Sequence, residues 1–118
     1  MIVMVFEFTV EPAEYEAYLE ESSALRTQLA RIDGFISVER FASHSEPGRF
    51  VAIGYFRDEE AVRRWRNLPE HRRAQMLGRD RFFSEYRLVM AEALRDYSRR
   101  RRDTAPEDSN RAHIPGDA

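Results

Sequence analysis

The sequence predicts an α+β protein with the ferredoxin-like β-α-β-β-α-β plan, an antiparallel four-stranded sheet with its helices on one face. Three observations predict it. Four segments have apolar residues with strand periodicity, two intervening segments have helical periodicity, and chain breakers separate these segments. The chain has 118 residues, 42% of them hydrophobic, which suits one globular domain.

The first strand and the first long helix are expected within residues 2–34. Alternating side chains predict a strand over residues 2–9. Pro12 fits the first position of a helix, and Gly34 ends it. Between them, positions spaced three or four residues apart form one helix face: Tyr15, Leu19, Ser22, Leu25, Leu29 and Ile32.

A β-hairpin is expected next. Residues 35–43 and 50–57 have the composition of strands, and the segment between them contains Pro47 and Gly48. The two strands therefore pair as neighbours in the sheet.

The second half of the domain is predicted to contain two helices and the last strand. Asp58 can cap a helix that Pro69 breaks, and Pro69 begins a short third helix that Gly78 closes. The inward stripe of the second helix consists of Ala61, Val62, Trp65 and Leu68. Residues 79–85 are expected to form a loop and residues 86–94 the last strand.

Both faces of this sheet are apolar. Val51 and Ile53 oppose Phe50 and Ala52 along one strand, so neither face has the polar pattern of a solvent-exposed surface. Helices can cover only one face. We therefore expect a homodimer in which a second copy of the chain covers the other face.

The folded domain is expected to span residues 1–97. Residues 98–118 begin with an arginine-rich run, 99–102, and continue with polar residues that lack the apolar content needed to repay ordering. We expect a disordered, solvated tail without a function of its own.

The composition excludes several kinds of chemistry from this chain. It has no cysteine, and all 19 cationic residues are arginines, so disulfides, thiolate metal sites and lysine nucleophiles are excluded. No metal is expected, because His44, His71 and His113 make a zinc site only if two loop residues converge with a helical one.

The net charge and the length of the apolar runs indicate which partners and which location to expect. A net charge of −2 argues against a nucleic-acid partner, and the longest apolar run, residues 2–6, is far too short to span a membrane. The first residues resemble a strand rather than a secretory signal. We expect a cytoplasmic protein that binds neither nucleic acid nor a membrane.

Three segments resemble the antibiotic biosynthesis monooxygenase family. They are residues 33–41 (DGFISVERF), 65–72 (WRNLPEHR) and 85–88 (EYRL), in the order the family has them. The resemblance covers roughly residues 1–97. It implies a dimeric α+β barrel with a small pocket between the helices and the sheet of each subunit. Family members include cofactor-free oxygenases of aromatic polyketides and haem-degrading monooxygenases.

The function that this resemblance implies is a cofactor-independent monooxygenase that oxidises a small aromatic or polyketide-like substrate with dioxygen. A deprotonated phenol or enol can pass an electron to dioxygen without metal or flavin, so the protein supplies a dry cavity and hydrogen bonds. The expected catalytic residues are His71, Trp65 and Tyr86. The expected substrate-binding residues are Phe6, Phe8, Phe56, Asn67, Phe82, Phe83 and Arg87.

Several of these residues also fit structural roles. Trp65 fits core packing, Asn67 can cap a helix, and Phe82 and Phe83 can fill the core. His71 lies near a helix amino terminus, where the helix dipole lowers a histidine pKa and keeps the ring neutral.

Two alternative functions stay open. One is a haem-binding or haem-degrading monooxygenase. The haem-degrading branch of the family uses an asparagine, a tryptophan and a histidine, of which only Trp65 clearly matches here. The other is a non-catalytic dimer of the same fold that binds a small ligand.

Overall fold

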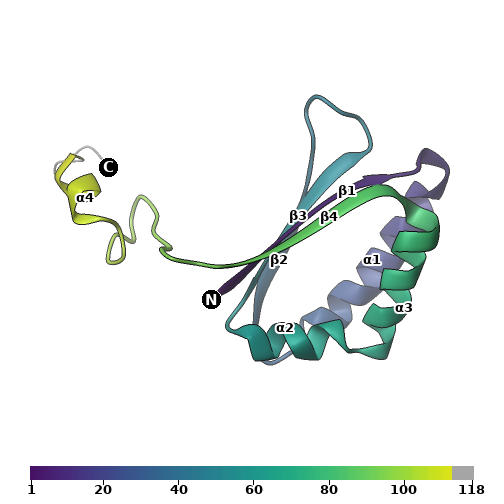
Figure 1. Ribbon diagram of the computed structural model, residues 1–118, viewed down its shortest axis with the longest axis horizontal. Helices are drawn as coiled ribbons and strands as arrows, with labels where there is room; N and C mark the ends of the chain where they lie inside the picture. Colours follow the sequence, from purple (N-terminus) through teal and green to yellow (C-terminus); the bar gives the residue numbers. More distant parts are fainter. Residues whose placement is uncertain (113–118) are drawn as a thin grey trace.

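The computed structural model describes residues 1–112 and contains one antiparallel sheet with the strand order β2-β3-β1-β4. The strands are β1 (Ile2–Val10), β2 (Phe35–Ala42), β3 (Arg49–Phe56) and β4 (Phe83–Glu92). The helices α1 (Tyr15–Leu29), α2 (Glu59–Arg66) and α3 (Pro69–Leu77) lie on the same side of this sheet (Figure 1). The predicted α+β class and ferredoxin-like order of elements are confirmed.

The boundary between α3 and the last strand differs from the sequence prediction. A π-helical turn, Gly78–Phe82, follows α3, and β4 begins at Phe83, within the segment predicted as a loop. The strand extends this far because Phe83 pairs with Val10, while the Glu11 amide donates to the Phe82 carbonyl at 2.9 Å. A Cβ on the buried Gly78 would lie 2.6 Å from the Phe83 ring, so the turn requires glycine.

The two faces of the sheet follow from the pairing register. On β1, Met4, Phe6 and Phe8 belong to the face that the helices cover, which we call the covered face. The opposite face, which we call the open face, has no helix over it in the described part of the chain (Figure 1). Its apolar residues are Val3, Val5, Phe41, Val51, Ile53, Tyr55, Val89 and Ala91.

The main core lies between the covered face and the helices. It is a cluster of buried apolar side chains from β1, β3, α1 and α2: Ile2, Met4, Leu29, Phe56, Ala61 and Val62. Phe56 is completely buried, and its ring lies 5.5 Å from that of Trp65 and 5.8 Å from that of Phe35. The core thus fixes the position of α2 on the sheet.

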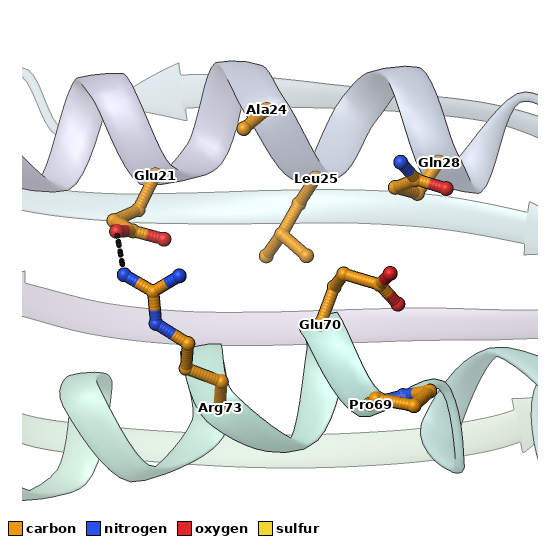
Figure 2. A pocket seen from close by; sticks show the side chains of 7 residues that line it. All are labelled: Glu21, Ala24, Leu25, Gln28, Pro69, Glu70 and Arg73. Carbon is orange, nitrogen blue, oxygen red and sulfur yellow. Dashed lines mark hydrogen bonds and ion pairs between the residues drawn. The ribbon is translucent and has the colours of Figure 1, made fainter.

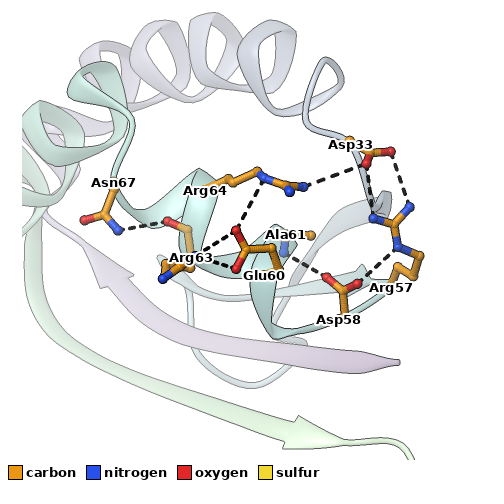
Figure 3. Close-up of polar contacts among 8 residues, drawn as sticks. All are labelled: Asp33, Arg57, Asp58, Glu60, Ala61, Arg63, Arg64 and Asn67. Carbon is orange, nitrogen blue, oxygen red and sulfur yellow. Dashed lines mark hydrogen bonds and ion pairs between the residues drawn. The ribbon is translucent and has the colours of Figure 1, made fainter.

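Ion pairs stabilise the start of α2. Arg57 pairs with Asp33 and with Asp58, both at 3.2 Å (Figure 3). Asp58 Oδ1 accepts a hydrogen bond from the Ala61 amide at 2.9 Å, so the predicted helix cap is confirmed. This hydrogen bond, followed by that from Arg57, lowers the pKa of Asp58, and the Arg57 hydrogen bond lowers the pKa of Asp33.

After β4 the chain leaves the sheet and makes mostly local contacts (Figure 1). Asp96 forms an ion pair with Arg101 at 2.8 Å, and its carbonyl accepts a hydrogen bond from Thr104 Oγ1 at 2.7 Å. A short helix, α4 (Glu107–Ala112), follows. The predicted tail therefore has local structure up to residue 112, and residues 113–118 lie outside the described residues. Within residues 1–112 no helix could cross a membrane.

Candidate functional site

A cavity of about 530 Å³ lies between the covered face and the helices α1, α2 and α3. Side chains of β1, β2, β3 and β4 form its floor, and side chains of the three helices and the π-helical turn form its walls. Seven of the ten residues predicted for the site line it: Phe6, Phe8, Trp65, His71, Phe82, Phe83 and Tyr86.

The other three predicted residues lie elsewhere. Phe56 belongs to the core beneath Trp65. Asn67 ends α2, where its side chain donates to the Arg63 carbonyl at 3.0 Å (Figure 3). Arg87 belongs to the open face, and its side chain is 75% exposed. Strand alternation separates Arg87 from its neighbour Tyr86, which faces the cavity.

Aromatic rings form part of the cavity floor. Phe8 lies 4.9 Å from both Phe6 and Phe83, measured between ring centroids. Tyr86 lies 6.2 Å from Phe6 and 6.3 Å from Phe83. These rings offer edges and faces on which a planar apolar ligand can pack.

Trp65 connects the core to the cavity. One contact is with Phe56 in the core, and the other is a stack with His71, whose ring centroid is only 3.8 Å away. Among the described residues, the buried indole Nε1 has no hydrogen-bond partner. A buried donor without a partner is energetically costly, which makes this nitrogen the polar atom of Trp65 that has most to gain from a new acceptor.

His71 is neutral at pH 7. Burial, the largest cause, and the charge of Arg72 lower its pKa from 6.5 to about 4, and hydrogen bonding with the backbone of Trp65 and Arg66 opposes them. Its Nδ1 lies 3.0 Å from Gln75 Nε2. The pKa is lowered as the sequence predicts, but the principal cause is burial rather than the helix dipole.

Sequence reasoning missed a polar cluster at the β2 side of the cavity. Arg40 Nη1 donates to the Tyr18 hydroxyl at 3.3 Å and to Ser22 Oγ at 3.1 Å. The signal was present in the sequence. Ser22 is polar at an inward position of the first helix, and Arg40 shares its strand face with Val38.

The cavity is rich in positive charge. Five arginines line it: Arg26, Arg40, Arg66, Arg72 and Arg79. The one acidic residue that lines it is Glu21, whose carboxylate pairs with Arg73 at 3.1 Å. This ion pair joins α1 to α3 beside a second, smaller pocket of about 300 Å³ (Figure 2).

Within residues 1–112 no three His, Asp or Glu side chains are grouped to hold a metal ion. The ring of His71 already interacts with Gln75 and with the backbone of Trp65 and Arg66. Hydrogen bonds of this kind orient the ring, and they are also typical of histidines that bind a metal.

Comparisons with known proteins agree on the family. The profile of the antibiotic biosynthesis monooxygenase family matches residues 1–77. A Pyricularia oryzae protein named jasmonate monooxygenase ABM is 39% identical over 92 residues, which are 78% of this chain and 43% of that protein. The chain therefore spans less than half the length of this curated relative.

Solved structures share the fold. SnoaB, a cofactor-independent oxygenase from Streptomyces nogalater, has a TM-score of 0.65 and 24% identity, covering 80% of this chain and 94% of SnoaB. A Mycobacterium tuberculosis protein has a TM-score of 0.73 and 17% identity, covering 82% of this chain and 98% of that protein. The profile match and the curated relative together show that the chain belongs to the antibiotic biosynthesis monooxygenase family.

Proposed function

We propose that this protein is a cofactor-independent monooxygenase that oxidises a small aromatic or polyketide-like phenol or enol with dioxygen. The observation that carries the proposal is the unpartnered Trp65 N–H beside a neutral His71 in a cationic, aromatic cavity. The names of the Pyricularia and Streptomyces relatives, a monooxygenase and a cofactor-independent oxygenase, support it.

The reaction balances without an external reductant. A methylene group that a neighbouring phenol makes acidic loses a proton, and the resulting anion gives an electron to dioxygen. The methylene becomes a carbonyl, one oxygen atom enters the product, and the other leaves as water with the two hydrogens. The protein has to stabilise the anion and keep bulk water away.

Electrostatic stabilisation is the main contribution that we assign to the cavity. A base of pKa about 4 accepts a proton from a substrate acid of pKa near 10, the value typical of a phenol, only at a cost of roughly 8 kcal/mol. The arginines offset this cost by stabilising the substrate anion, and the Trp65 N–H donates to its oxygen. His71 then acts as a proton acceptor that is neutral across the physiological pH range, with Tyr86 as the other proposed catalytic residue.

We also propose that the protein works as a homodimer. The half-buried side chains of Val3, Val5, Ile53 and Val89 form an apolar surface in the middle of the open face. A second open face is equally apolar and can cover it.

Oxygen uptake by the purified protein tests the proposed reaction. It is measured with dihydroxynaphthalenes, with an anthrone, and with jasmonate, the compound in the relative's name, before and after treatment with a metal chelator. Uptake that survives the chelator, with one atom of ¹⁸O₂ in the product, is the expected result. Ligand binding without uptake for every compound would instead identify a non-catalytic dimer.

Trp65→Phe tests the indole donor. The variant keeps the apolar ring but removes the N–H, so we expect kcat to fall about 10- to 100-fold while the melting temperature changes little. Arg31→Gln, at an exposed position after α1 and outside both the cavity and the open face, is the control, and its kcat should equal that of the wild type. A Trp65→Phe variant with unchanged kcat would remove the indole N–H from the mechanism.

A further inference from the structure

We propose that the molecule bound in this cavity carries a carboxylate, and that Arg40, Tyr18 and Ser22 bind that carboxylate. As a statement about the substrate, this inference rests on the proposed monooxygenase function. As a statement about a binding site, it rests on the geometry of β2 and α1 alone.

The residues on the floor of the cavity indicate how a ligand is oriented in it. Pairing aligns Arg40 of β2 with Ala52 of β3, Phe6 of β1 and Leu88 of β4, and all four side chains line the cavity. Three interstrand spacings separate Arg40 from Leu88, roughly 14 Å. The row is charged only at its β2 end, and Ala52 leaves room above the sheet. A ligand with an acidic head and an apolar body matches this row.

The hydrogen bonding of Arg40 leaves it ready for an anion. Its hydrogen-bond partners among the described residues are both hydroxyls, and both contact the same nitrogen, Nη1. In the part of the chain that the structure describes, no carboxylate lies within 4 Å of Arg40, and Nε and Nη2 have no hydrogen-bond partner. A half-buried guanidinium without a counter-ion is unfavourable, and a carboxylate can bind two of its N–H groups at once.

Tyr18 and Ser22 complete the site. Each hydroxyl accepts a hydrogen bond from Arg40 and still has its own hydrogen to donate to a carboxylate oxygen. The Arg40 guanidinium carbon also lies 5.4 Å from the centre of the Tyr18 ring, which limits its movement. The neighbouring carboxylate of Glu39 cannot compete, because Glu39 pairs with Ile53 on the open face.

Anaerobic calorimetry of the full chain tests the site without turnover. The probes are 2-naphthoate and its neutral analogue 2-naphthamide, which differ in the acidic group. The wild type should bind naphthoate at least tenfold more tightly than naphthamide. In Arg40→Gln this ratio should fall to about one, with the affinity for naphthamide changed less than twofold.

Two further variants distinguish the site from the general positive charge of the cavity. Arg26→Gln removes another cavity arginine and should keep most of the preference for naphthoate. Tyr18→Phe keeps the ring and should reduce the affinity for naphthoate about threefold. Should Arg40→Gln fail to fold, Arg40→Lys replaces it, and a reduced but measurable preference is expected because the charge remains without the planar fork.

The outcomes are separable from those of the oxygen-uptake experiment. Equal affinity of the wild type for the acid and the amide overturns the carboxylate site, as does no binding of naphthoate at millimolar concentration. A preference that persists in Arg40→Gln also overturns it. A clear preference that Arg40→Gln abolishes supports the site even where no oxygen is consumed, in which case only the monooxygenase function fails.

Discussion

The covered face and the open face of the sheet are built by the same strands but differ in side-chain size in the middle of β3. There Ala52 and Gly54 belong to the covered face, between Phe50 and Phe56, whereas Val51, Ile53 and Tyr55 belong to the open face. The two small residues leave room for the cavity on one side, and the larger ones make an apolar surface on the other. One strand can therefore encode a binding site and an interface independently, because successive residues point to opposite faces.

The largest expected effect tests whether stability comes mainly from the covered face. Phe56→Ala removes a fully buried ring from the core and should lower the free energy of unfolding by about 3–5 kcal/mol. Tyr55→Ala, its neighbour on the open face, should cost much less at concentrations where the protein is monomeric. Urea denaturation followed by circular dichroism measures both, and equal losses would contradict the comparison.

The second-largest expected effect is a pH dependence of the free energy of unfolding. It comes from His71, which also lies on the covered side of the sheet. The pKa of His71 is 6.5 in the unfolded chain and about 4 in the folded one, so the unfolded state takes up a proton first as pH falls. The free energy of unfolding should be highest above about pH 6.5 and fall by about 3 kcal/mol towards pH 4.

Urea denaturation between pH 4.5 and 7 measures how the free energy of unfolding changes with pH. His71→Gln should lose most of this change, whereas His44→Gln, in the exposed turn between β2 and β3, should keep it. A wild-type slope in His71→Gln would show that other groups cause the dependence. The pKa of about 4 also moves the acid limit of any His71-dependent activity from the ordinary histidine range near pH 6 to about pH 4.

A charge in the open face tests its role in association. Ile53→Arg places a guanidinium in the middle of the apolar surface and should raise the dimer dissociation constant at least thirtyfold, since an unpaired charge in an interface is strongly unfavourable. Analytical ultracentrifugation measures the constant. Naphthoate binding should persist in the variant, because the cavity lies on the other face. A wild type that is monomeric at every concentration would refute the dimer.

The smallest effect is expected from the tail, which covers neither face. Removing residues 99–118 should change the free energy of unfolding by less than about 0.5 kcal/mol, because the described contacts of this segment are mostly local. Thermal melting of the shortened chain against the full chain gives the comparison. A clear loss of stability would show that the tail belongs to the folded domain.

The faces of the strands and the capped helix were predictable because local patterns determine them. Alternation places Phe6 and Phe8 on one side, and Asp58 stands where a helix cap is required. Strand alternation also decides between neighbours such as Tyr86 and Arg87, but only once the inward side of β4 is known. The motif over residues 85–88 includes both residues and does not distinguish them.

The polar end of the cavity was harder to predict. Strand alternation places Arg40 on the same face as Val38, but its contacts with Tyr18 and Ser22 join residues about twenty positions apart. The start of β4 at Phe83 could not be predicted either, because it depends on pairing with the distant Val10. Tertiary contacts of this kind leave no periodic signal.

Because Trp65 stacks on His71, the intrinsic fluorescence of the protein can report on the cavity. Trp65 is the single tryptophan of the sequence, so all indole fluorescence comes from one position at the cavity wall. A protonated imidazole 3.8 Å away quenches an indole far more strongly than a neutral one. Emission intensity would therefore report the protonation of His71, and a ligand that separates the two rings would change it without any added label.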